Sequence, residues 1–204
     1  MKSLRRTFGY FIRNNLKSFT RPLILASSSP RRQFLMKEAG FQFLVESPDI
    51  DESFPADMDV RLVPKFLAEN KARVFEHNIT NEIVITADTV VILNNKILNK
   101  PLDRSEAISM LTDLSGKTHL VITAVCLFSK GKVDTFDDHT EVTFKKLSQK
   151  EIEFYIDTWK PFDKAGAYGA QDWLGMVGIE KINGSYFTVM GMPMHKVYSH
   201  LMNF

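Results

Sequence analysis

The sequence predicts a mixed α/β protein, and three observations support this fold class. Apolar segments of strand length alternate with segments whose apolar residues recur at helical spacing. The chain has 204 residues, 44% hydrophobic and 25% charged, so it can bury a sizeable core in one large or two-lobed domain. Neither an internal repeat nor a low-complexity linker divides it. We therefore expect one folded domain over residues 22–204, preceded by an extension, residues 1–21.

The extension is basic and amphipathic. Its apolar residues recur at helical spacing, and residues 1–37 hold nine Lys or Arg and no acid. Its apolar runs are too short for a secretory signal or a membrane span. Three interpretations of the extension stay open: a transit peptide, a helix on a membrane surface, and a helix packed on its own domain or on a partner subunit. Residues 38–204 hold 17 basic and 24 acidic side chains, a balance that argues against nucleic-acid binding.

The first elements are a strand, a helix and a second strand. The apolar run Leu23–Ala26 predicts a buried strand, and a helix over residues 30–39 follows it, with a proline at its first position. Side chains of Ser27–Ser29 are expected to cap that helix, and Gly40 to end it. Phe41–Val45 then predicts the second strand.

The later elements follow the same alternation of strand and helix patterns. We first expect a helix over residues 59–76, then strands Ile83–Thr86 and Val90–Leu93 interrupted by the triplet Ala87-Asp88-Thr89, and a turn at Asn94-Asn95. Next come a helix over residues 103–114 capped by Asp103, a hairpin of Val121–Phe128 and Val133–Phe144, and a helix Ser148–Thr158 with the capping-box pair Ser148 and Glu151. The last elements are strands near Met176–Ile182 and Phe187–Met190 and a helix after Pro193.

An anion pocket is indicated where the first strand ends. Three serines, a proline and two arginines follow one another at residues 27–32. Free N–H groups at a helix start favour phosphate, and Arg31 and Arg32 add charge with planar donor geometry. An ordinary capped helix with solvated arginines is the structural alternative.

A second candidate is Asp88, a lone carboxylate in an apolar, strand-forming run. An acid is costly there unless it faces a cleft, a metal or a partner. It can accept a proton from water or orient a cation, and otherwise it is a turn residue. The pair Asp51-Glu52 is compatible with a Mg²⁺ site or with plain surface.

A third candidate is the small-residue segment 162–171, where Asp163 and Lys164 precede glycines that let a ligand approach the backbone. A loop with a surface ion pair explains this segment equally well. The single cysteine, Cys126, lies in an apolar run and is expected to be a buried small hydrophobe, which fits a reducing, cytoplasmic setting.

Taken in chain order, these segments resemble the Maf family of nucleoside triphosphate pyrophosphatases. The resemblance covers roughly residues 22–203 and is far more specific than any one motif. It rests on Leu-Ala-Ser-Ser-Ser-Pro-Arg-Arg at 25–32, Asp51-Glu52, Asn70-Lys71-Ala72, Ala87-Asp88-Thr89-Val90-Val91, Lys100-Pro101, Leu114-Ser115-Gly116 with His119, Asp163-Lys164-Ala165-Gly166-Ala167-Tyr168 with Gln171, Ile182-Asn183-Gly184-Ser185-Tyr186 and Gly191-Met192-Pro193.

The resemblance implies an elongated α/β molecule similar to the inosine triphosphatase fold, with a mixed central sheet and two lobes around a nucleotide cleft. Family members hydrolyse a nucleoside triphosphate between the α and β phosphates, giving a monophosphate and pyrophosphate, with a divalent cation, Mg²⁺ or Mn²⁺. Homodimers are common in the family. The late motif with Gln171 resembles the subgroup that acts on dTTP and UTP.

The resemblance also implies roles for individual residues. Asp88 would activate water, and Arg31, Thr89 and Gln171 match positions linked to base choice. A triphosphate needs cations around it, which Arg32, Lys71, Lys100 and Lys164 can supply with the Ser27 hydroxyl, while Glu52 is the expected metal ligand. The same cations are expected to keep Asp88 ionised.

Two positions depart from the family pattern. Asp172 stands where the family usually has Gly, and Trp173 adds bulk beside it. Either change can reshape the base end of the pocket, so modified pyrimidine nucleotides such as 5-methyl-UTP and pseudouridine triphosphate stay open as substrates. A nucleotide-binding regulator of septum formation, without turnover, is the alternative function.

Overall fold

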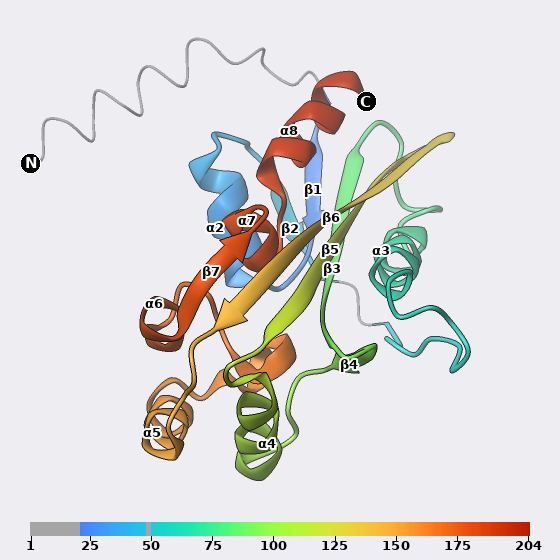
Figure 1. The fold of residues 1–204 in the computed structure, drawn as a ribbon. Coiled ribbons are helices and arrows are strands. Elements are labelled where there is room, and N and C mark those ends of the chain that lie inside the picture. The colour runs from blue at the N-terminus through green and yellow to red at the C-terminus, as the bar shows by residue number, and fades with distance from the viewer. Residues whose placement is uncertain (1–20, 48–49) are drawn as a thin grey trace, which may run out of the picture.

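The computed structural model describes residues 21–47 and 50–204 and shows an elongated α/β molecule (Figure 1). The helix predicted for the extension lies outside these residues. In chain order the elements are β1 (Leu23–Ala26), α2 (Pro30–Glu38), β2 (Leu44–Glu46), α3 (Val63–Arg73), β3 (Ile83–Leu93), β4 (Lys96–Leu98), α4 (Arg104–Leu114), β5 (Thr118–Ser129), β6 (Lys132–Phe144), α5 (Gln149–Trp159), η1 (Pro161–Asp163), η2 (Ala165–Ala167), α6 (Trp173–Gly178), β7 (Ile179–Asn183), α7 (Tyr186–Val189) and α8 (Met194–Asn203).

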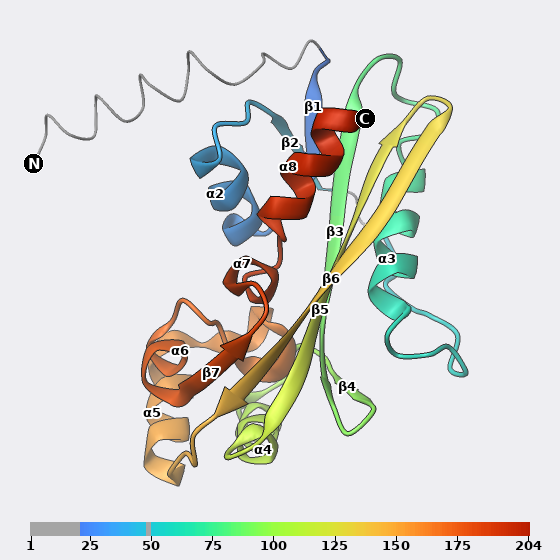
Figure 2. The same ribbon diagram turned by 45° about the horizontal axis from the view of Figure 1, so that its top comes forward.

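One mixed sheet runs through the molecule, as the fold prediction requires. Within the described ranges it has seven strands in the order β2-β1-β3-β5-β6-β7, with β4 paired to β3. Strand β1 lies parallel to β2 and β3, and all other pairs are antiparallel. The long strands β3, β5 and β6 connect the two ends of the molecule (Figure 2). None of the helices in these ranges has the length and hydropathy that a membrane crossing needs.

Hydrophobic cores at the two ends of the long strands make the two lobes. In one lobe β3 alternates, so that Ile83, Ile85 and Ala87 pack with α2 and α8 while Val84 packs with α3. Helices α4, α5 and α6 gather at the other end, around the buried side chains Phe144, Tyr155, Tyr168 and Leu174 (Figure 2). The period of two therefore also turns the even positions Thr86 and Asp88 toward α3.

Strand β3 differs from the sequence prediction because it runs unbroken through the polar triplet. On one side β5 pairs with it along that stretch, with Asp88 opposite Ala124. On the other side β1 pairs with it as far as Ile85, and β4 pairs only from Val91 onward. Between these two partners the β3 edge around Asp88 has no neighbouring strand in the described residues. We call this opening, over residues 87–90, the edge gap.

Three predicted strands are corrected. The strand predicted near Met176–Ile182 begins only at Ile179, because residues 173–178 form α6. Phe41–Val45 is shortened to β2, because the N–H of Phe41 still bonds the Met36 carbonyl and closes the end of α2, with Gly40 at a φ of 85°. The strand predicted near Phe187–Met190 is instead α7. Its sequence has high strand propensity, but β7 leaves its partner β6 after residue 183 and the chain turns inward, so tertiary packing decides.

Candidate active site

A cavity of about 950 Å³ opens at the edge gap, between the two lobes. Its volume is in the range of small-molecule sites, and its walls carry five basic and three acidic side chains. This charge balance suits a polyanionic ligand. All ten residues predicted from the sequence line it: Ser27, Arg31, Arg32, Glu52, Lys71, Asp88, Thr89, Lys100, Lys164 and Gln171.

Asp88 lines this cavity and is only 8% exposed. Helix α3 approaches it through two contacts. The hydroxyl of Thr86 donates to the Ala68 carbonyl over 2.6 Å, and one helical turn later the Lys71 Nζ lies 2.7 Å from Asp88 Oδ1. Lys71 Nζ also lies 2.7 Å from Glu52 Oε1. One of its three N–H donors therefore remains for a ligand.

The pKa of Asp88 is raised above its ordinary value, and burial is the largest cause. Lys71 and then Arg32 favour the charged form and oppose this effect. The prediction was that neighbouring cations keep Asp88 ionised; they do favour the charged form, but the loss of solvent outweighs them. A carboxylate with a raised pKa is a stronger base and is better matched to accepting a proton near neutral pH.

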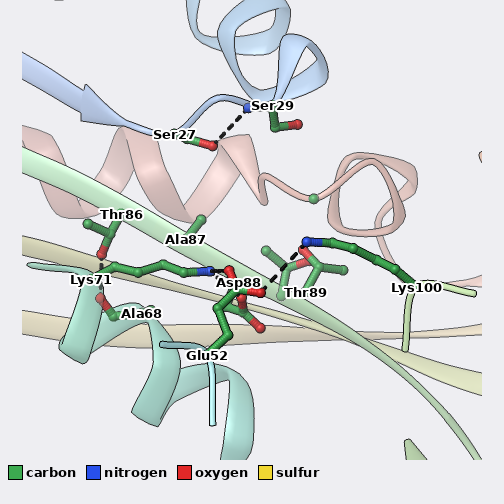
Figure 3. Close-up of polar contacts among 12 residues, drawn as sticks. Ser27, Ser29, Glu52, Ala68, Lys71, Thr86, Ala87, Asp88, Thr89 and Lys100 are labelled. Atoms are coloured by element: carbon green, nitrogen blue, oxygen red, sulfur yellow. Dashed lines mark hydrogen bonds and ion pairs between the residues drawn. The ribbon is translucent and has the colours of Figure 1, made fainter. Parts of the chain in front are cut away.

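Lys100 and Glu52 lie on the open side of the cavity. Lys71 and Lys100 extend toward Glu52 and Asp88 from opposite sides (Figure 3), and Lys100 Nζ is 3.7 Å from Glu52 Oε2. Partial burial is the largest single influence on the pKa of Glu52 and raises it. The hydrogen bond and charge of Lys71, with the charge of Lys100, together outweigh burial, so the pKa is lowered. Glu52 is thus a charged carboxylate in a partly open position.

The carboxylates fit a divalent cation that is shared with a substrate. In the part of the chain that the structure describes, no group of three or more His, Cys, Asp or Glu side chains is arranged to hold a metal by itself. Mg²⁺ commonly binds through one or two carboxylates while phosphates and waters complete its shell. Glu52 and Asp88 already lie on either side of the Lys71 ammonium, so this pair is arranged around positive charge.

Arg32 is largely committed to holding the site together. Burial lowers its pKa, although Asp88 opposes this, and the guanidinium remains charged. Four of its five N–H donors have acceptors among the described residues, namely the Gly191 carbonyl at 2.9 Å, the Ala87 carbonyl at 2.9 Å, Thr89 Oγ1 at 3.1 Å and Ser27 Oγ at 3.3 Å. These bonds tie the start of α2, the edge gap and the turn before α8 to one another.

Thr89 supports Arg32 through a chain of hydroxyls. Thr123 Oγ1 donates to the Thr188 carbonyl over 2.7 Å, so it accepts from Thr89 Oγ1 at 2.9 Å. The Thr89 hydroxyl therefore gives its proton to Thr123 and accepts from Arg32. With its proton committed, Thr89 can offer a ligand only an acceptor.

The start of α2 is free to receive an anion, although for a different reason than predicted. Ser29 is the N-cap residue, but its side chain makes no capping bond, so the prediction of a serine cap is wrong. The Ser27 hydroxyl does not cap the helix either; its Oγ accepts from the Ser29 N–H at 3.3 Å (Figure 3). The first-turn N–H groups of the helix are thus left without a side-chain acceptor, which favours an anionic ligand.

Lys164 and Arg31 approach the cavity from opposite lobes and share Asp163. Lys164 Nζ lies 2.7 Å from Asp163 Oδ1 and 3.7 Å from Asp172 Oδ2, and its side chain is 12% exposed. Arg31 Nη1 is 3.5 Å from Asp163 Oδ2. The alternative of a plain surface ion pair does not hold for Lys164, which is mostly buried.

Gln171 is held by Asp172 and, through it, by Tyr155, which sequence reasoning missed. Its Nε2 donates to Asp172 Oδ1 over 3.0 Å, and Asp172 Oδ2 accepts from the Tyr155 hydroxyl at 2.8 Å. Tyr155 lies on the apolar face of α5 with Ile152 and Ile156. A tyrosine on a buried helix face needs a partner for its hydroxyl, and that requirement was the available signal.

Trp173, the other departure from the family pattern, does not add bulk at the base end. Its ring stacks on Trp159, with centroids 5.9 Å apart, and meets the ring edge of Phe154.

Cys126 is buried and free, as predicted, and burial raises the pKa of its thiol to about 11.

Comparisons with known proteins agree with this geometry. A family model described as Maf-like protein matches residues 22–204. A dTTP/UTP pyrophosphatase of Flavobacterium psychrophilum is 46% identical over 182 residues, which is 89% of this chain and 93% of that protein. One of Bacteroides fragilis is 46% identical over 88% of this chain and 94% of its own length, and one of Porphyromonas gingivalis is 42% identical over 94% and 97%.

Among solved structures, a HAM1 protein from Coxiella burnetii matches 61% of this chain and 73% of its own, with a TM-score of 0.45 and 14% identity. The family model covers nearly all of the described residues, including every side chain that lines the cavity, and the curated relatives cover most of the chain. Together they establish that this chain belongs to the Maf family.

Proposed function

We propose that this protein hydrolyses nucleoside triphosphates, foremost dTTP and UTP, to the monophosphate and pyrophosphate, and so removes unwanted nucleotides from the cellular pool. The observation that carries the proposal is a buried carboxylate, Asp88, in the wall of a basic cavity of nucleotide size. The curated relatives that match the chain over nearly their full length are named dTTP/UTP pyrophosphatases, which supports this choice of substrates.

The phosphates would lie between α3 and the start of α2. The Ser27 hydroxyl, the first-turn N–H groups of α2 and the cations Arg31, Lys100 and Lys164 would hold them, together with the remaining N–H of Lys71. Arg32 would act chiefly by fixing the shape of this wall, since the protein already uses most of its donors.

Asp88 would take the proton from a water molecule as that water attacks the α-phosphorus. The new P–O bond forms as the bond from the α-phosphorus to the bridging oxygen breaks, and pyrophosphate leaves with the extra negative charge. Lys71, which contacts Asp88, and Lys100, which lies beside Glu52, would stabilise the charge that develops during this step.

The proposed cofactor is Mg²⁺ or Mn²⁺, with Glu52 as its protein ligand beside phosphate oxygens and water. Such an ion, when bound, neutralises phosphate charge and makes the phosphorus a better electrophile. The base would lie toward Gln171, with Arg31 and Thr89 nearby, and modified pyrimidines remain candidates for this end of the cavity.

We further propose that residues 22–204 form the catalytic domain, that the enzyme works in the cytoplasm as a homodimer, and that it binds no nucleic acid. The role of residues 1–21 stays a separate question. Size-exclusion chromatography with light scattering measures the oligomeric state, and a titration with duplex DNA at 50 mM and 200 mM salt tests the last point.

The deciding experiment is pyrophosphate release from a panel of triphosphates with Mg²⁺ or Mn²⁺. We expect release from dTTP and UTP, and we expect Asp88→Asn to lower kcat by about 10²- to 10⁴-fold while nucleotide affinity changes little. Asp113→Asn, at an exposed position on α4, is the matched control and should retain full activity.

Two results would contradict the proposal. Absence of pyrophosphate release from every triphosphate, with nucleotides still bound, would favour the regulator of septum formation. Normal turnover in Asp88→Asn would remove this residue from its role as the base.

A further inference from the structure

The amide of Gln171 has one end occupied and the other end without a partner. Its Nε2 donates to Asp172 Oδ1 at 3.0 Å. Its Oε1 is buried and has no hydrogen-bond partner among the described residues, although the side chain lines the cavity. A buried acceptor without a donor is uncommon in folded proteins, and in a ligand cavity it indicates a donor that arrives with the ligand.

Asp172 is itself held firmly, with its side chain 13% exposed. Its Oδ2 accepts from the Tyr155 hydroxyl at 2.8 Å and lies 3.7 Å from Lys164 Nζ. Because the Tyr155 oxygen accepts the Gly169 N–H at 3.1 Å, the tyrosine proton is free to point at the carboxylate. Gln171, Tyr155 and Lys164 together therefore fix the position of the Asp172 carboxylate.

Asp172 stands at the start of α6, but its carboxylate does not cap that helix. Asp172 is the N-cap residue of α6, a position where Asp normally accepts from the first helical turn, yet it makes no side-chain cap. Its carboxylate is turned toward Gln171 and Tyr155 instead. Gly169 permits this arrangement, since a Cβ there would lie 2.6 Å from Asp172 Oδ2 and 2.8 Å from Gln171 Nε2.

The chemistry of the two side chains decides which end of the amide is left over. An ionised carboxylate only accepts hydrogen bonds, so the NH₂ group of Gln171 must face it. A free glutamine could turn its amide over and present either a donor or an acceptor to a ligand. With Asp172 beside it, Gln171 has only the carbonyl oxygen to present.

We propose that Asp172 is a specificity-determining residue that acts through Gln171, fixing its carbonyl as the acceptor for the ring N3–H of uracil or thymine. This inference rests on the proposed function. Cytosine has an unprotonated N3 at the same place, so the carbonyl of Gln171 would meet a second acceptor there and both would lack a proton. The Asp172 carboxylate thus leaves Gln171 able only to accept a hydrogen bond from the base, which favours uracil and thymine over cytosine.

The first test is the base preference of Asp172→Asn, which keeps the shape but lets the Gln171 amide turn over. We expect the ratio of kcat/KM for UTP over CTP to fall about tenfold, mainly through a higher KM for UTP, with kcat for UTP nearly unchanged. Tyr155→Phe, which removes one support of Asp172, should move the ratio in the same direction by a smaller factor. Asp157→Asn, an exposed acid on α5 that pairs with Arg104, is the matched control and should leave the ratio unchanged.

A double-mutant cycle separates positioning from a general structural role. In a Gln171→Ala background, Asp172→Asn should have no further effect on the UTP to CTP ratio, because the residue through which it acts is gone. An equal fall in that background, an unchanged ratio in Asp172→Asn alone, or a uniform loss of kcat for all bases would overturn the inference. Thermal unfolding of each variant checks that it is folded.

Binding measurements keep this inference testable apart from turnover. Calorimetric titration with the α,β-methylene analogues of UTP and CTP, in the presence of Mg²⁺, measures base preference without hydrolysis. If the wild-type protein releases no pyrophosphate, the proposed function fails, while a preference for the UTP analogue that Asp172→Asn abolishes still supports the role of Asp172. Equal binding of both analogues by the wild-type protein would overturn that role.

Discussion

At the scale of single residues, Arg32 shows how much of this site is held by one side chain. Its guanidinium joins the β1–α2 loop, the edge gap and the turn before α8 through contacts with Ser27, Ala87 and Gly191. A lysine could reproduce the charge but not the planar fork that makes several bonds at once. The geometry of the cavity therefore depends on an arginine at this position.

We expect Arg32→Lys to lower the free energy of unfolding by about 2–4 kcal/mol, because several charge-assisted hydrogen bonds are lost and buried carbonyls are left without donors. Arg31→Lys should cost far less stability, since Arg31 has one acceptor among the described residues, at 3.5 Å. Urea denaturation of the two variants measures the difference. Equal losses would show that the buried contacts of Arg32 contribute little.

His119 makes the stability of the fold depend on pH. It is 2% exposed, its Nε2 lies 2.7 Å from the Tyr168 hydroxyl, and burial lowers its pKa to about 4. An unfolded histidine titrates near 6.5, so between the two values the unfolded state binds more protons than the folded state. Stability from this residue is therefore complete above pH 6.5 and is lost as the pH falls toward 4.

From this shift we expect about 2 kcal/mol less stability at pH 5 than at pH 7 from His119 alone. His119→Gln, which can still reach Tyr168 but does not titrate, should show a correspondingly smaller difference between the two pH values. Paired urea denaturation curves at pH 7 and pH 5 give the comparison. A variant as sensitive to acid as the wild-type protein would assign the effect to other groups.

At the scale of elements, the helices show which local signals can be trusted. Ser148 and Glu151 form the predicted capping box at the start of α5, and Asp103 accepts from the Glu106 N–H at the start of α4. The serines before α2 gave a similar signal, but they leave the helix uncapped in favour of the cavity. A capping pattern next to arginines can thus mark a ligand site as well as a helix start.

The two kinds of serine should respond differently to the same change. Ser148→Ala is expected to lower the free energy of unfolding by about 1 kcal/mol, because the Glu151 N–H loses its acceptor. Ser29→Ala should change stability by less than about 0.5 kcal/mol, since its side chain caps nothing. Thermal or urea unfolding compares them, and an equal cost would mean that Ser29 does cap its helix in solution.

The strands show where sequence patterns reach their limit. The hairpin of β5 and β6 was predictable from two long strand-forming runs on either side of Lys130-Gly131, and the Asn94-Asn95 turn from residues that tolerate positive φ. The continuity of β3 was not, because its polar triplet is stabilised by β5, which comes later in the chain. Strand propensity likewise misassigned α7, whose position depends on the end of β7.

At the scale of the whole molecule, the cavity gathers side chains that lie far apart in the sequence. Periodicity and capping identified the elements, but only the resemblance to a family predicted that Ser27, Lys71, Asp88 and Lys164 would share one site. The buried network of Tyr155, Asp172 and Gln171 was beyond both, because a departure from a family pattern does not say what the new side chain contacts.

Because both lobes contribute to the cavity, a nucleotide should stabilise the entire fold. We expect α,β-methylene-UTP with Mg²⁺, at about 100 times its Kd, to add about 2.7 kcal/mol to the free energy of unfolding and to raise Tm by several degrees. Differential scanning calorimetry with and without the analogue measures this shift. Asp113→Asn should respond as the wild-type protein does, and a response confined to one of two separate transitions would contradict a single cooperative unit.

The edge gap has a further consequence for association between molecules. Bare strand edges act as templates on which other chains add, and the flanks of this one, in β3, are rich in Val and Ile. The Ala87 carbonyl at this edge is already taken by the Arg32 guanidinium, so an incoming strand finds an acceptor occupied and a positive charge in its path. We therefore expect Arg32, which shapes the nucleotide site, also to hinder the addition of another strand at this edge.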